Sequence, residues 1–270
     1  MLIFCIIEQI CFVKTSVWII VNYTPFLAFA ALLVATSQAP AEQSLVRGVV
    51  ELFTSQGCDS CPKADKMLGE MVHQKDIVAL AYHVDYWDYR GWRDTLATPE
   101  NTDRQRNYMK AMKARAFYTP QAVINGRTHV NGADQLAVDE KLAETPTLPV
   151  AVNLKQDRDV LVIDVPGQEG PRQNAHVLLV SYEAMSPVKI ERGENAGHTV
   201  TYWNAVRDMQ TTGMWHGQPA RFEIPMSEIA KKGIGGCAVL VQSVDKDGHP
   251  ATILGAASMP FDAQDGPNKN

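Results

Sequence analysis

Residues 51–65 read ELFTSQGCDSCPKAD and set Cys58 and Cys61 between two different sequence patterns. Before them, residues 45–54 (LVRGVVELFT) are apolar and β-branched, which predicts a buried strand. After them, from Cys61 to His73, apolar residues recur at helical spacing. A Cys-x-x-Cys at a strand-to-helix junction suits a redox centre, half of a metal site or a structural disulfide, so its surroundings have to distinguish these three.

Working outward, the first half of the chain predicts a regular order of strands and helices. Residues 77–85 (IVALAYHVD) predict a second buried strand, and Thr98-Pro99-Glu100 is the start signal of a helix that ends near residue 115. Two short strands joined by an Asn-Gly turn and a helix at 133–143 follow. The predicted order is β-α-β-α-β-β-α, and the fold class is α/β.

The second half of the chain has a different pattern. After residues 144–149 (ETPTLP), strand-like runs are separated by Gly, Asn, Asp and Pro turns, which is typical of antiparallel β-structure. We therefore expect a first domain over residues 42–145 and an antiparallel β-sandwich-like domain over 146–270. The short connection favours a second layer packed on the first. Covering the cysteines, binding a partner and structural support all stay open as its role.

The composition excludes several classes of function. The chain has 270 residues, of which 46% are hydrophobic and 20% charged, as in ordinary globular proteins. A net charge of −5 gives no electrostatic basis for binding nucleic acid. His198, His216 and His249 lack the spacing of metal ligands, and no Gly-rich phosphate loop occurs. We expect no cofactor, and no metal site outside the cysteine pair.

Residues 1–41 read as a signal peptide or an N-terminal anchor. Lys14 precedes a run without charged residues from Val17 to Ala35, and small residues follow, which is the order of a secretory signal that would be cut after Ala41. An uncharged run of this length can also span a bilayer, so a retained anchor stays open. In both cases we expect a periplasmic or secreted protein that contacts a membrane only through this segment, if it is uncleaved.

Export also changes how the cysteines are counted. Cys5 and Cys11 fall in the segment expected to be removed, which leaves Cys58, Cys61 and Cys237 in an oxidising compartment. If Cys58 and Cys61 pair, Cys237 is the remaining thiol. Its strand-like setting predicts a small buried hydrophobe.

This order of elements, with Cys-x-x-Cys at the first strand-to-helix junction and Thr119-Pro120 just before the third strand, resembles the thioredoxin fold in its glutaredoxin-type form. The motifs VVELFTSQGCDSCPKAD, HVDYWD and YTPQAVING resemble a bacterial family of secreted thioredoxin-like proteins catalogued as a domain of unknown function. The resemblance extends from about residue 46 to 262 and implies the fold and export, but no substrate. It also implies a cis Thr119-Pro120 peptide against the disulfide, with the backbone beside it free to pair with an extended substrate.

The chemistry of the cysteines follows from their place at a helix start. Unpaired N–H groups and the positive end of the helix dipole favour a thiolate, so we expect Cys58 to be the exposed nucleophile. Cys61 would then resolve the mixed disulfide. Asp59 opposes this effect, because a carboxylate disfavours a second negative charge beside it.

The second strand brings further polar residues to the same edge of the sheet. It ends in HVDYWD, which places Asp85, Tyr86 and Trp87 near the cysteines as substrate-binding candidates. His83 or Asp85 could accept a proton from the resolving cysteine. The alternative is that these polar side chains only satisfy one another's hydrogen-bonding groups at the end of the strand.

The sequence thus predicts an exported thiol-disulfide oxidoreductase that uses Cys58 and Cys61 on a protein or small-thiol substrate. A periplasmic protein that binds a soft metal such as Cu(I) through both thiolates, perhaps with His83, stays open. So does a non-catalytic binding module whose disulfide only staples a loop. The substrate, the redox direction and the oligomeric state do not follow from the sequence.

Overall fold

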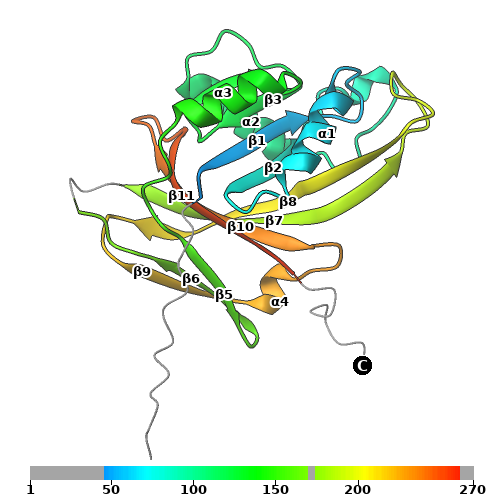
Figure 1. Ribbon diagram of the computed structural model, residues 1–270. Coiled ribbons are helices and arrows are strands. Elements are labelled where there is room, and N and C mark those ends of the chain that lie inside the picture. Colours follow the sequence, from blue (N-terminus) through cyan, green and yellow to red (C-terminus); the bar gives the residue numbers. More distant parts are fainter. Residues whose placement is uncertain (1–45, 170–173, 262–270) are drawn as a thin grey trace, which may run out of the picture. The chain divides into compact units, whose positions relative to one another are not determined.

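A mixed β-sheet of eight strands organises the computed structural model, which describes residues 46–169 and 174–261 (Figure 1). Its strands are β1 (Gly48–Thr54), β2 (Ile77–His83), β3 (Gln121–Ile124), β4 (Thr128–Asn131), β7 (Ala175–Lys189), β8 (Thr199–Trp215), β10 (Gly236–Val244) and β11 (Pro250–Pro260). Across the sheet they lie in the order β11-β10-β7-β8-β2-β1-β3-β4. The predicted signal or anchor, residues 1–41, lies outside the described residues. No described helix combines the length and the apolar character that a membrane-spanning segment needs.

The first half of the described chain has the predicted order β-α-β-α-β-β-α. β1 pairs in parallel with β2 and antiparallel with β3, and β3 pairs antiparallel with β4. The helices are α1 (Cys61–Met71), α2 (Pro99–Ala111) and α3 (Gln135–Glu144), with a short 3-10 turn, η1 (Asp88–Arg90), after β2. The predicted helix start is confirmed, because the Thr98 side chain accepts a hydrogen bond from the backbone N–H of Asn101.

β1 is buried along its whole length. Leu52 packs on one face with residues of α1 and α3, and Phe53 packs on the other with Tyr108 of α2. A strand buried on both faces needs a continuous apolar run rather than alternation. The exception is Glu51, whose buried carboxylate is ion-paired with Arg104 of α2.

The second half of the chain adds four strands to the same sheet and a smaller sheet of its own. β7 and β8 are 15 and 17 residues long and pair with each other over most of their length. A three-stranded antiparallel sheet of β5 (Asn153–Asp157), β6 (Val160–Val165) and β9 (Ala220–Pro225) forms the second layer, and the short helix α4 (Met226–Ile229) follows β9. Ile163 of β6, Val177 of β7 and Val239 of β10 meet in the core between the layers.

The separate domain expected over residues 146–270 differs from the structure in one respect. Two antiparallel layers do pack on each other, but the larger layer belongs to the same sheet as β1 to β4, because β8 meets β2 at Ala81 and Ala205. All described residues belong to one compact unit. The physical reason is length: at about 3.3 Å per residue, β8 extends from the core between the two layers to α1.

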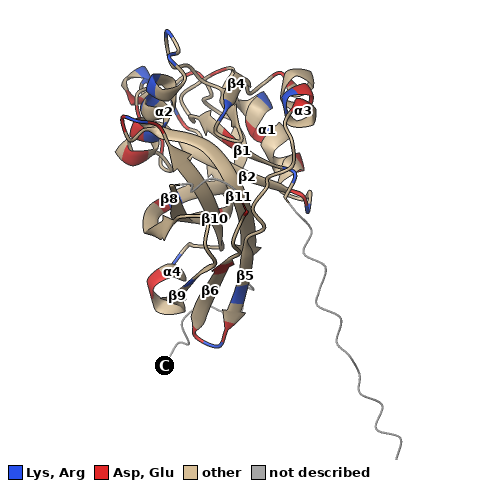
Figure 2. Cartoon of the chain, turned by 90° about the vertical axis from the view of Figure 1, so that its left-hand side faces the viewer, with Lys and Arg blue, Asp and Glu red and all other residues tan. Residues whose placement is uncertain are grey.

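The charged side chains lie mainly on helices and turns, with both signs mixed (Figure 2). The strands carry mostly apolar and uncharged side chains in this view.

Candidate redox site

The two cysteines of the Cys-x-x-Cys motif form a disulfide where β1 gives way to α1. Their sulfur atoms are 2.11 Å apart and their Cα atoms 5.4 Å apart. Cys58 lies in the turn after β1, where its N–H donates to the carbonyl of Ser55, and Cys61 is the first residue of α1. Because β1 and β2 are parallel, the segments that follow them meet at this edge of the sheet.

Both half-cystines are fully buried, with 0% of their surface exposed. The expectation of an exposed Cys58 is therefore wrong. The connection between β7 and β8 packs against this turn, where the Asn195 Nδ2 donates to the carbonyl oxygens of Gln56 and Cys58, at 2.9 Å each. Asn195 is itself buried, so the cysteine turn and this side chain exclude water from one another.

The predicted cis peptide is confirmed at Thr119-Pro120. The structure also brings Trp87 to this peptide, because the indole N–H donates to the Thr119 hydroxyl at 2.7 Å. Trp87 lies against the cysteine turn as well: a Cβ atom on Gly57 would stand 3.2 Å from the Trp87 Cβ. Trp87, Thr119 and the residue before Cys58 thus form one neighbourhood.

The other two residues predicted beside Trp87 are directed to α2. The Asp85 carboxylate accepts a hydrogen bond from the Thr102 hydroxyl at 2.7 Å, and the Tyr86 hydroxyl donates to Gln105. Burial is the main cause that raises the pKa of Tyr86 to about 12. Asp85 is thus engaged by a helix on the side of the sheet that Phe53 and Tyr108 fill.

A buried cluster of ionisable groups is bonded to the turn that carries Cys58. His83 Nδ1 lies 2.8 Å from the Asp94 carboxylate, and both side chains are fully buried. Asp94 also accepts from the backbone N–H of Gln56, which ties the cluster to the cysteine turn. On α1, four residues after Cys61, the buried Asp65 accepts from the Thr54 hydroxyl at 2.7 Å.

The charges in this cluster are tuned by burial and by one another. Burial raises the pKa of Asp65 to about 7, although His83 and the hydrogen bond from Thr54 oppose the rise. Burial disfavours the imidazolium of His83, but the Asp94 carboxylate outweighs it and raises the pKa of His83. Burial likewise disfavours the Asp94 carboxylate, yet His83 lowers its pKa. Among the described residues, Asp65 Oδ2 and His83 Nε2 have no hydrogen-bond partner.

Three residues of this site were missed by the sequence reasoning: Asp65, Asp94 and Asn195. One signal was available for Asp65, because it falls between the apolar residues Ala64 and Leu68 on the buried side of the predicted helix. No local pattern marks Asp94 or Asn195. Both reach the site through long-range contacts that depend on the whole fold.

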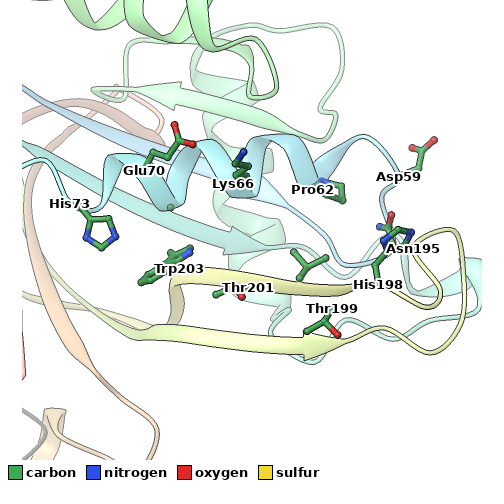
Figure 3. A pocket seen from close by; sticks show the side chains of 12 residues that line it. Asp59, Pro62, Lys66, Glu70, His73, Asn195, His198, Thr199, Thr201 and Trp203 are labelled. Atoms are coloured by element: carbon green, nitrogen blue, oxygen red, sulfur yellow. The ribbon is translucent and has the colours of Figure 1, made fainter.

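A groove of about 760 Å³ lies between α1 and β8 (Figure 3). Asp59, Pro62 and Asn195 line the end next to the cysteine turn. At the other end, His73 in the turn after α1 meets Trp203 of β8, with ring centroids 5.3 Å apart. Its remaining lining residues are Lys66, Gly69, Glu70, His198, Thr199, Val200 and Thr201.

Cys237, the thiol expected to be left over, is buried in β10 and takes part in no disulfide. Burial raises the pKa of its thiol to about 12. It lies in the core between the two sheets, which agrees with the expectation of a buried hydrophobe.

Comparisons with known proteins place the chain in a family without assigning an activity. A family model described as protein of unknown function (DUF1223) matches residues 49–242. A crystal structure of a protein from Agrobacterium tumefaciens, a structural-genomics target, is 42% identical and superposes with a TM-score of 0.73. The match covers 82% of this chain and 97% of that chain. No curated protein matches the sequence.

Proposed function

The chain belongs to the family of unknown function DUF1223, and we propose that it is an exported thiol-disulfide oxidoreductase with a thioredoxin-like core and Cys58–Cys61 as its redox centre. The observation that carries the proposal is the disulfide between the turn after β1 and the first residue of α1. A disulfide closed over so short a loop constrains the unfolded chain less than one that closes a long loop. Chemistry is therefore a better reason for it than stability.

The thioredoxin-like assignment is supported by topology. The order β-α-β-α-β-β-α, a parallel β1–β2 pair and antiparallel β3 and β4 resemble the glutaredoxin-type form of that fold. The position of the disulfide at the start of the first helix agrees with the same assignment. β7, β8, β10 and β11 then extend the sheet beyond β2.

The helix start suits Cys58 as the attacking sulfur. The first turn of α1 has no side-chain cap, so its N–H groups and the helix dipole can stabilise a thiolate. In the reduced protein the Cys58 thiolate attacks a substrate disulfide, and one substrate sulfur leaves as a thiolate. The Cys61 thiolate then attacks the Cys58 sulfur, the second substrate sulfur leaves, and two electrons have passed to the substrate. The reverse sequence oxidises a substrate dithiol.

Asp65 is the best proton acceptor for Cys61. Residues four apart on a helix lie on the same face, and both side chains are buried. A carboxyl group with a pKa of about 7 can take up and release a proton near neutral pH. His83 and Asp85, which the sequence suggested, are less suitable, because His83 is ion-paired with Asp94 and Asp85 is bonded to Thr102.

Substrate and location belong to the same proposal. A protein or small-thiol substrate would meet the site near Trp87, Thr119 and Pro120, and the N-terminal segment would direct the chain to the periplasm or outside the cell. The substrate-binding part of this proposal is supported by the hydrogen bond between Trp87 and Thr119.

A redox titration tests the proposed function. We expect the Cys58–Cys61 pair to equilibrate with thiol buffers at a midpoint between about −270 and −120 mV, the range of known oxidoreductases. A disulfide that stays closed below about −300 mV would indicate a structural staple. A repeat with Cu(I) separates the soft-metal alternative, since a thiolate-bound metal would hold the pair reduced and shift the midpoint strongly.

A further inference from the structure

One side chain from the distant β7–β8 connection is bonded to the turn that carries Cys58. The Asn195 carboxamide has the same chemistry as a peptide bond, and its N–H₂ group occupies the carbonyls of Gln56 and Cys58. A backbone N–H of another chain could make the same hydrogen bonds. The contact therefore resembles one that the backbone of a substrate would make, with Asn195 in the place of the substrate.

The tip of this hairpin, residues 190–198, is attached by few contacts. Glu194 is ion-paired with Arg90 at the surface, and Gly193, with φ +80°, lies against Trp92. From 191 to 198, Asn195 alone is buried. A segment with so few buried apolar contacts opens more easily than the core around it.

The groove between α1 and β8 leads to the same asparagine. Its volume of about 760 Å³ is in the range of sites that enclose a short peptide or a small molecule. Its floor is aromatic at Trp203, and Lys66 and Glu70 offer charges of both signs. Such a lining suits a mixed polypeptide better than an ion of one sign.

The wall formed by β8 favours an extended chain. Residues 199–203 pair with β7 on one side, and β8 pairs with β2 only at Ala205. In an antiparallel ladder, hydrogen-bonded residue pairs alternate with pairs that are not hydrogen-bonded. The bond from the Ile190 N–H to the His198 carbonyl makes that pair a hydrogen-bonded one. The backbone groups of Thr199 and Thr201 therefore point away from β7. An unpaired strand edge of this kind binds extended polypeptides by main-chain hydrogen bonds.

We propose that this groove receives an extended, cysteine-containing segment of a polypeptide, and that Asn195 keeps the disulfide shut until the segment replaces its hydrogen bonds. The proposal rests on the proposed function for the reaction that follows. A thiolate of the segment attacks the Cys58 sulfur, the bond to Cys61 breaks, and Cys61 leaves as a thiolate that takes up a proton. A second thiol of the segment releases Cys58, so two substrate thiols become a disulfide and the protein disulfide becomes two thiols.

The gate is tested by the rate at which dithiothreitol reduces the disulfide of the full chain, followed by thiol alkylation and mass spectrometry. Replacing Asn195 by Ala should speed this reduction about tenfold or more, because opening the site no longer requires two hydrogen bonds to break. Asn101→Ala is the matched control, since its buried amide also bonds a backbone carbonyl, that of Val206, away from the disulfide. Glu194→Gln, which only weakens the attachment of the tip, should give a smaller acceleration.

The groove is tested with a short synthetic peptide that carries two cysteines. Thr201→Trp should fill the groove and slow reduction by the peptide about tenfold or more, while reduction by dithiothreitol stays unchanged. Thr211→Trp, on the same strand but outside the groove, should leave both rates as they are.

Each outcome decides part of the proposal. Equal rates for Asn195→Ala and Asn101→Ala, with Glu194→Gln also unchanged, would overturn the gate. Equal slowing of both reductants by Thr201→Trp, or none, would overturn the groove. These are single reductions that need no turnover, so they stand apart from the redox midpoint, which tests the proposed function itself.

Discussion

At the scale of single residues, Asp65 is the group whose setting departs most from that of an ordinary carboxylate. It faces the core from α1, receives one hydrogen bond from Thr54, and leaves its second oxygen without a partner among the described residues. An unpaired buried charge is costly. The neutral acid is therefore favoured in the folded protein, and burial raises the pKa of Asp65 to about 7.

This predicts a pH dependence of stability with a definite sign. The folded pKa is about 7 and the ordinary value is 3.8, so Asp65 stabilises the folded state most below pH 4. That contribution falls as the pH rises from about 4 to about 7, because the unfolded chain releases the proton first. Asp65→Asn should remove the fall and make the oxidised protein more stable at pH 8, by up to about 4 kcal/mol.

The measurement is urea unfolding of the oxidised protein at pH 5 and pH 8. Asp59→Asn, at the exposed end of the same motif, controls for the loss of one carboxylate. If Asp65→Asn and the parent lose the same stability between the two pH values, Asp65 is ionised in the folded state and is not the proton acceptor.

At the scale of elements, α1 and β8 meet where a helix glycine faces an indole. A Cβ atom on Gly69 would stand 2.6 Å from Cδ1 of Trp203, so the absence of a side chain allows the two elements to approach. This contact sets the floor of the groove and the position of the helix that carries Cys61.

Gly69→Ala should consequently destabilise the protein, although the same change inside an unconstrained helix stabilises it by about 1 kcal/mol. In a Trp203→Ala background the clash is gone, and Gly69→Ala should then raise the melting temperature. Thermal unfolding of the parent, both single variants and the double variant measures this coupling. A higher melting temperature for Gly69→Ala alone would show that Trp203 gives way easily.

The elements also show which parts of the fold could be predicted from the sequence. β1 and β2 are apolar runs, and Thr98-Pro99 marks the start of α2. The turn pair at Asn125 separates β3 from β4. All of these are local signals. The sharing of one sheet by both halves is not local, because it depends on where the long strands β7 and β8 pair. The same holds for the site: Cys58, Cys61 and Trp87 are marked by motifs, whereas Asn195 reaches the cysteine turn only through that pairing.

At the scale of the whole molecule, export is part of the proposed function. The expected processing site gives a mature protein that begins at or close to Glu42, and N-terminal sequencing of the exported material checks it. A start before Ala35 would instead indicate a retained anchor.

The proposed redox reaction involves both halves of the chain, because Asn195 of the second half is bonded to the turn that carries Cys58 in the first. The asymmetry between the two cysteines tests this reading most directly. Cys61→Ser should leave the first attack intact and trap substrates as mixed disulfides on Cys58, since nothing resolves them. Cys58→Ser should trap nothing, because its hydroxyl stays un-ionised near neutral pH.

Both variants are expressed with residues 1–41 in place and separated on non-reducing gels, with bound copper and thermal stability measured in the same preparations. The account predicts adducts on Cys61→Ser alone, all of them lost on reduction. If the two variants behave alike, with no adduct and an equal loss of stability or of copper, Cys58–Cys61 is a staple or a metal site and the oxidoreductase account is contradicted.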